Sequence, residues 1–153
     1  MTLTYHASAL RTAQIPQVLP LIKATWPGVD LDTWRRFAKF FVHGRGGDLA
    51  GARILQDSAD CICGIFVYRL ERDLQHGLVL AVPLFSAVDV ANSPNTTRAL
   101  LEACLTQAGS LECETLHVHL YEQQSGLASR LKKLGLAQER NMLTMPVTEE
   151  WRA

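Results

Sequence analysis

The chain has 153 residues and carries 15 basic and 15 acidic side chains, so its formal net charge is zero. This length suits one domain, residues 1–153, and the balanced charge excludes a strong global attraction to nucleic acid or to an anionic membrane surface. Hydrophobic residues make up 48% and aromatic residues 7%, which favours a packed core and argues against a base-stacking platform. We therefore expect no nucleic-acid partner.

The sequence also predicts where the protein is located. No apolar run reaches the roughly 18 residues that a membrane helix needs, and residues 1–13 do not resemble a signal peptide. None of the cysteines forms a CxxC pair or a zinc-like spacing; they are Cys61, Cys63, Cys104 and Cys113. We interpret them as reduced core residues of a cytoplasmic protein that does not contact a membrane.

The first third of the chain predicts one strand and two helices. Alternation favours a strand over residues 3–8, and helical spacing favours a helix over residues 14–25, which Pro20 could kink or shorten. A second helix, 32–42, carries an aromatic stripe that we interpret as core, with a substrate-facing wall as the alternative. The glycine-rich run 43–48 lacks the Lys-Ser/Thr ending of a P-loop and is interpreted as a connector.

The middle of the chain predicts three successive strands. They cover residues 52–56, 61–70 and 78–90, and the last is apolar on both faces, as a central strand would be. Pro83 cannot donate a hydrogen bond to a neighbouring strand, so we expect a bulge or a split of pairing there.

The last third alternates helices with strands. Ser93 and Pro94 open a helix that runs to about residue 108, a strand follows over 115–121, and a helix over 125–134 ends at Gly135. A final strand is expected over 141–147. This order predicts an α/β fold with a mixed, twisted sheet of about six strands and helices on both faces.

Two stretches resemble the GNAT superfamily of acetyl-CoA-dependent N-acetyltransferases. The first is Ala87-Val88-Asp89-Val90 leading into Arg98-Ala99-Leu100-Leu101, and the second is the late helix that ends in Leu134-Gly135-Leu136. The opening Ala13-Gln14-Ile15-Pro16 is similar to the start of the family's first helix. The resemblance implies a single GNAT-like domain that uses acetyl-CoA as a co-substrate.

The resemblance also implies which residues hold the cofactor. Backbone groups of Val88 and Val90 would pair with the pantetheine arm, and Gln124 falls at an Asn position that helps to hold it. The amides at the start of the third helix would face the pyrophosphate; they belong to Asn95, Thr96 and Thr97. A helix N-terminus is by its own physics an anion site, and a bound phosphate would also balance Arg98 in the first turn.

The sequence departs from the family at several of these positions. Two family glycines fall on Asn95 and Thr97, a family tyrosine that acts as general acid falls on Leu131, and the aromatic residue after the late glycine is Leu136. Two functions follow as alternatives. The first is a divergent N-acetyltransferase that acetylates an amine of a small molecule or a protein. The second is a catalytically degenerate member that binds a ligand or a partner.

Candidate catalytic residues gather near residue 119. In an extended strand His117, His119 and Tyr121 share one face, and we expect His119 to act as base and Tyr121 as a substitute acid. Asp89, at the end of the central strand, is a second candidate base or a loop cap. The alternative is a half-buried histidine pair satisfied by its neighbours.

The sequence predicts no metal site, and it predicts a homodimer. His117 and His119 could point toward one ion, but no third ligand is evident and we expect no metal. The segment after Leu136 is short for two closing strands. Because an unpaired sheet edge invites another chain, we expect a homodimer.

Overall fold

The computed structural model describes residues 4–42, 49–88 and 95–152. It contains a five-stranded sheet in the order β1-β2-β3-β4-β5. The strands are β1 (His6–Ala9), β2 (Ala50–Gln56), β3 (Ile62–Asp73), β4 (Gly77–Ala87) and β5 (Thr115–Val118). The first four are antiparallel neighbours, and β5 runs parallel to β4, so the predicted mixed sheet is confirmed with slightly fewer strands than expected.

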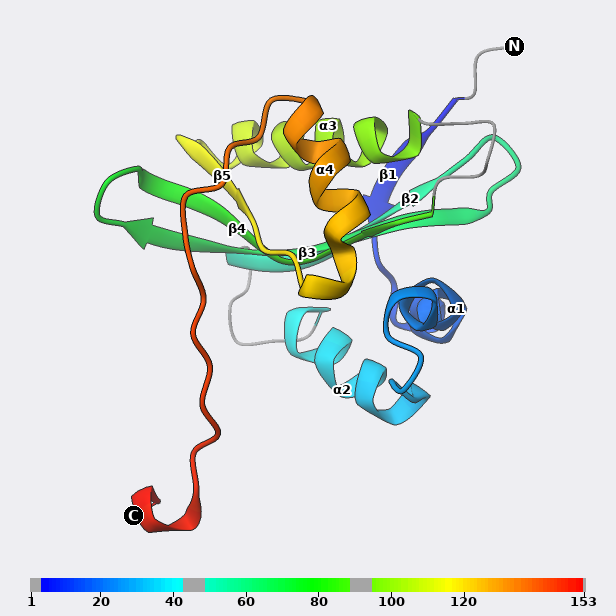
Figure 1. Ribbon diagram of the computed structural model, residues 1–153. Helices are drawn as coiled ribbons and strands as arrows, with labels where there is room; N and C mark the ends of the chain where they lie inside the picture. The colour runs from blue at the N-terminus through cyan, green and yellow to red at the C-terminus, as the bar shows by residue number, and fades with distance from the viewer. Residues whose placement is uncertain (1–3, 43–48, 89–94, 153) are drawn as a thin grey trace.

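Helices cover both faces of the sheet, as predicted (Figure 1). They are α1 (Ile15–Thr25), α2 (Leu31–Val42), α3 (Asn95–Ser110) and α4 (Ser125–Lys133), with short 3-10 turns η1 (Thr12–Gln14), η3 (Glu122–Gln124) and η4 (Glu149–Trp151). One apolar cluster joins α1 and α2 to the sheet, and a second joins α3 and α4 to its other face. None of these helices is long and apolar enough to cross a bilayer.

The two early helices confirm their predicted positions. Pro20 lies inside α1 without ending it, and Asp30 caps α2 by accepting a hydrogen bond from the N–H of Thr33 at 2.8 Å. Trp34 is 2% exposed and donates its indole N–H to the carbonyl of Ile15. The aromatic stripe is therefore core at Trp34 and Phe41, whereas Phe40 is exposed.

Pro83 produces the irregularity that the sequence predicts. Val67 pairs with Leu84 but Arg69 pairs with Ala81, so one residue of β3 lies opposite two residues of β4. Proline offers no N–H to either neighbouring strand, and the extra residue of a bulge changes the direction in which the following backbone groups point.

The final predicted strand is wrong. Residues 135–148 form no regular element, and the segment runs away from the sheet toward the C-terminus (Figure 1). Pro146 removes one ladder donor from it, and the contacts near its start are ion pairs of Glu139 and Arg140. The sheet consequently has five strands in the described part of the chain.

Candidate functional site

The strands β4 and β5 separate part of the way along their length. Their pairing runs from Val79 opposite Thr115 to Val82 opposite Val118. One further hydrogen bond joins the N–H of His119 to the carbonyl of Val82 at 3.0 Å. The next residue of β4 is Pro83, which lacks an N–H, and β5 ends at Val118 rather than at the predicted residue 121. The separation thus begins where the sequence removes a donor.

A side chain links the two segments beyond the separation. Gln124 is 5% exposed and donates its amide N–H to the carbonyl of Phe85 at 2.7 Å. Its amide oxygen accepts the N–H of Tyr121 at 3.1 Å. Gln124, which the resemblance assigns to the cofactor, thus holds the η3 turn against β4.

The direction of the β4 backbone corrects one predicted cofactor contact. The N–H of Val88 donates to the carbonyl of Cys63 at 2.9 Å, so it is engaged with β3. Backbone groups alternate in direction along a strand, and the carbonyl of Phe85 already points toward Gln124. It follows that Phe85 and Ala87, rather than Val88, direct their N–H and C=O groups to the side on which β5 has separated. The bulge at Pro83 determines which backbone groups of β4 point to this side. Val90 and Asp89 lie outside the described residues.

The start of α3 provides the predicted helix N-terminus. The helix is described from Asn95 onward, and the predicted opening at Ser93 and Pro94 lies outside the described residues. Thr96 and Thr97 are 2% and 1% exposed. The hydroxyl of Thr96 lies 3.1 Å from that of Tyr5. Both threonines are thus buried, and Asn95 and Arg98 are the exposed residues of this first turn.

Thr97, which the resemblance aligns with a family glycine, has an ordinary backbone conformation. Among the described residues, only Asp60 and Glu112 are non-glycine residues with positive φ, so Thr97 adopts ordinary helical geometry, which a β-branched residue tolerates. Arg98, one residue further on, is exposed and available to an anion from solvent.

His119 follows directly after β5 and is half-buried. Burial lowers the pKa of His119 below its ordinary value of 6.5; Glu71 opposes this shift, while Arg69 and His117 add to it. A neutral imidazole is the form that can accept a proton. The environment of His119 therefore extends its range as a base toward lower pH.

Tyr121 occupies a different setting from the one predicted. Because β5 ends at Val118, the period-two argument for one shared face does not reach residue 121. Tyr121 is 44% exposed, and its ring meets that of Trp26 edge to face at 5.0 Å between centroids. Trp26 ends α1, so the turn after β5 contacts the connection between α1 and α2; a sequence spacing of 95 residues gives no signal for this contact.

Leu131 and Cys63 are not suited to act as a general acid or as a thiolate nucleophile. Leu131, at the family's tyrosine position, is 2% exposed and belongs to the core. All four cysteines are free thiols, although Cys61 is exposed rather than in the core as predicted. Burial, with a smaller effect of Asp57, raises the pKa of Cys63 to about 11, which leaves it a thiol at neutral pH.

Two surface hollows of about 420 Å³ each lie elsewhere. One is between β1 and α3, where Tyr5 and Glu102 contribute to its lining. The other is between β2 and the end of α3, beside Tyr68. Neither is lined by His119 or Gln124, so they are separate from the β4–β5 region.

The fold is that of the GNAT acetyltransferases. Aminoglycoside N-acetyltransferase AAC(6')-Iy in complex with CoA matches with a TM-score of 0.76 at 10% identity, covering 96% of this chain and 97% of that one. A possible acetyltransferase from Clostridium difficile 630 gives 0.72 at 11% identity, covering 95% and 99%. Glucosamine-6-phosphate N-acetyltransferase from Arabidopsis thaliana gives 0.64 at 11% identity, also covering 95% and 99%.

These likenesses concern the fold alone, because the identities are near one residue in ten. No family model matches the sequence, and no curated protein matches it. The expected resemblance to the acetyltransferases is thus confirmed in three dimensions and over nearly the whole chain.

Proposed function

We propose that the protein is an acyl-CoA-dependent N-acetyltransferase that transfers an acetyl group directly from acetyl-CoA to an amine of a small molecule or a protein. One observation carries this proposal: β4 and β5 separate at Pro83, and the chain then enters the N-terminus of α3 within a fold shared with acetyltransferases. Among the fold neighbours, one is described as a complex with CoA.

The cofactor would lie along β4 and end at α3. Ala87 and the N–H of Phe85 would offer backbone groups to the amides of the pantetheine arm, because these groups face the separated side of β4, whereas the carbonyl of Phe85 is already bonded to Gln124. The first-turn amides of Asn95, Thr96 and Thr97 would face the pyrophosphate, where the positive end of the helix dipole favours negative charge. Arg98 would add a charge-assisted contact.

Acetyl transfer itself needs few groups. The amine nitrogen attacks the thioester carbonyl carbon, and His119 accepts the proton that the nitrogen loses. The tetrahedral intermediate then re-forms its carbonyl and expels the CoA thiolate, which takes a proton from Tyr121. Asp89 stays an alternative base. The proton that the amine loses thus goes to His119, and the proton that the thiolate gains comes from Tyr121.

The direct test of this function is CoA release. Purified full-length protein, acetyl-CoA and a panel of amines are followed with a thiol reagent, and acetylated product is confirmed by mass spectrometry. We expect steady CoA release that depends on one class of amine. No release with any amine, from protein that binds acetyl-CoA, would contradict the catalytic proposal.

Arg98 gives a prediction about affinity. We expect Arg98→Ala to weaken CoA binding about tenfold, corresponding to roughly 1.4 kcal/mol, through loss of one phosphate contact. Isothermal titration measures it. Arg36→Ala removes an equally exposed arginine from α2, on the other face of the sheet, and should leave the Kd unchanged; equal effects of both variants would contradict the role of Arg98.

Leu131 supports a second candidate function. With leucine buried at the family's tyrosine position, the chain could instead be a degenerate GNAT-fold protein that binds a ligand or a partner. This candidate predicts acetyl-CoA binding, or none, without turnover. Amine-dependent CoA release that His119→Ala abolishes would exclude it.

The exposed edge of β5 supports the proposal of a homodimer. In the described sheet β5 is the last strand, and the extended segment beyond α4 exposes Met142, Leu143 and Met145 by 76%, 95% and 84%. Apolar side chains on an extended segment favour pairing with another sheet edge. We expect light scattering at tens of micromolar to give twice the chain mass; a monomer at that concentration would contradict it.

A further inference from the structure

Three potential metal ligands meet at one end of the sheet. Asp73 ends β3, His76 lies in the turn between β3 and β4, and His117 lies on β5. One ligand atom from each lies within 4.8 Å of the others. The rings of His76 and His117 meet edge to face with centroids 5.4 Å apart. Parallel pairing of β4 with β5 brings these residues together, although 41 positions separate the two histidines in the sequence.

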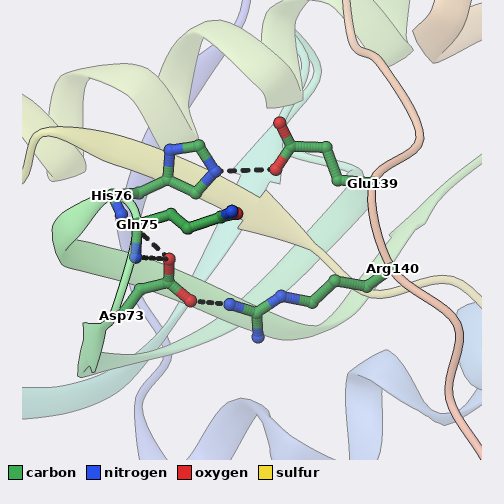
Figure 2. A network of polar contacts seen from close by, with 5 residues as sticks. All are labelled: Asp73, Gln75, His76, Glu139 and Arg140. Atoms are coloured by element: carbon green, nitrogen blue, oxygen red, sulfur yellow. Dashed lines mark hydrogen bonds and ion pairs between the residues drawn. The ribbon is translucent and has the colours of Figure 1, made fainter.

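Two of the three side chains already have partners, which Figure 2 shows. One oxygen of Asp73 accepts the N–H groups of Gln75 at 3.1 Å and His76 at 2.9 Å. The other pairs with Arg140. The Nε2 of His76 lies 2.7 Å from a carboxylate oxygen of Glu139. These contacts connect the segment after α4 to the β3–β4 turn.

His117 differs from the other two. Its Nε2 atom is buried and has no hydrogen-bond partner among the described residues. An unsatisfied buried polar atom is destabilising, so its presence in a cluster of metal-ligand side chains indicates a ligand-binding role. A metal ion would supply a partner for this atom, since a neutral imidazole nitrogen is a good ligand.

We propose that Asp73, His76 and His117 bind a divalent transition-metal ion of the zinc class, with Glu139 as a fourth ligand. Two imidazoles with carboxylates form a donor set that Zn²⁺ accepts in tetrahedral geometry. Ligand atoms on such an ion lie about 3.3 Å apart, so atoms within 4.8 Å of one another need to approach by up to about 1.5 Å. The two carboxylates outnumber the single positive charge of Arg140, which leaves a net negative site.

The ion would have a structural role. It would join the β3–β4 turn, β5 and the segment after α4; the first and the last of these otherwise meet through the contacts of His76 with Glu139 and of Asp73 with Arg140. Arg140 would compete with the ion, because both use Asp73. Strand alternation predicts His117 and His119 as the ligand pair, whereas the structure places His117 against His76. The proposal does not depend on the acetyltransferase function.

The test uses tag-free full-length protein titrated with Zn²⁺ by calorimetry and with Co²⁺ by visible absorption. We expect one ion per chain and the intensified visible bands of four-coordinate Co²⁺. His117→Gln and Asp73→Asn should each weaken binding by at least about tenfold, and Arg140→Gln should strengthen it by removing the competitor. His6→Gln changes an exposed histidine on β1 and should have no effect.

Several results would overturn the proposal. They are no binding of Zn²⁺ by the wild type at about 100 µM, a Kd for both His117→Gln and Asp73→Asn equal to that of the wild type, or a loss of affinity in Arg140→Gln. Circular dichroism confirms that each variant is folded. If His117→Gln fails to fold, Asp73→Asn decides the outcome, because Asp73 lies at the start of a surface turn.

Discussion

Replacing His119 with alanine is expected to lower the rate of amine-dependent CoA release by a factor of about 10²–10⁴, the usual contribution of a positioned general base. The N–H of His119 donates the last hydrogen bond between β4 and β5, where the two strands begin to separate. Steady-state kinetics should show the loss in kcat/KM, and calorimetry should show acetyl-CoA binding within about twofold of the wild type.

The lowered pKa of His119 determines how kcat/KM should change with pH. Burial, partly opposed by Glu71, lowers the pKa of His119 below 6.5, and a base acts only when neutral. As pH falls, kcat/KM should therefore stay high through 6.5 and decline only below it, whereas an ordinary histidine would already be half protonated there. His6→Ala, on exposed β1, serves as the control. A decline centred above 6.5, or a His119→Ala variant with wild-type rate, would contradict the assignment.

Replacing Gln124 with alanine is the second change with a large expected effect. The amide makes two hydrogen bonds, to the carbonyl of Phe85 and from the N–H of Tyr121, and it is 5% exposed. Removing it leaves the buried Phe85 carbonyl without this donor, so we expect the free energy of unfolding to fall by about 1–3 kcal/mol. Urea denaturation measures the change.

The same variant should weaken acetyl-CoA binding, because Gln124 holds the η3 turn against β4 where the cofactor would lie. Gln17→Ala removes the same side chain from an exposed position in α1 and should change stability by less than about 0.5 kcal/mol. An unfolding midpoint of Gln124→Ala equal to that of Gln17→Ala would show that the link across the separation contributes nothing.

Local patterns in the sequence predicted most of the fold. Extended patterning located β2 and β3, a run that is apolar on both faces located β4, helical spacing located α1 to α4, and Pro83 correctly marked the irregularity in the sheet. Each of these signals depends on residues that are close together in the sequence, so it can be recognised without the tertiary structure. The strand predicted at 141–147 failed because alternation alone does not supply a neighbour with which to pair, and Pro146 removes a donor.

The candidate site could be predicted only in part. Local signals predicted the third helix, although its predicted opening at Ser93 and Pro94 lies outside the described residues. The choice between Val88 and Ala87 depends on a bulge whose phase the sequence does not reveal. The edge-to-face contact of Trp26 with Tyr121 and the meeting of His76 with His117 arise from tertiary packing. Pairs so far apart in the chain leave no periodic signal.

The central claim is that acyl-CoA binds where β4 and β5 separate, and titration calorimetry of acetyl-CoA into the wild-type protein tests it most directly. We predict one site per chain with a micromolar Kd, and competition by CoA itself. Absence of binding by acetyl-CoA and by longer acyl-CoAs at millimolar concentration would contradict the account, because the α3 N-terminus would then not accept pyrophosphate.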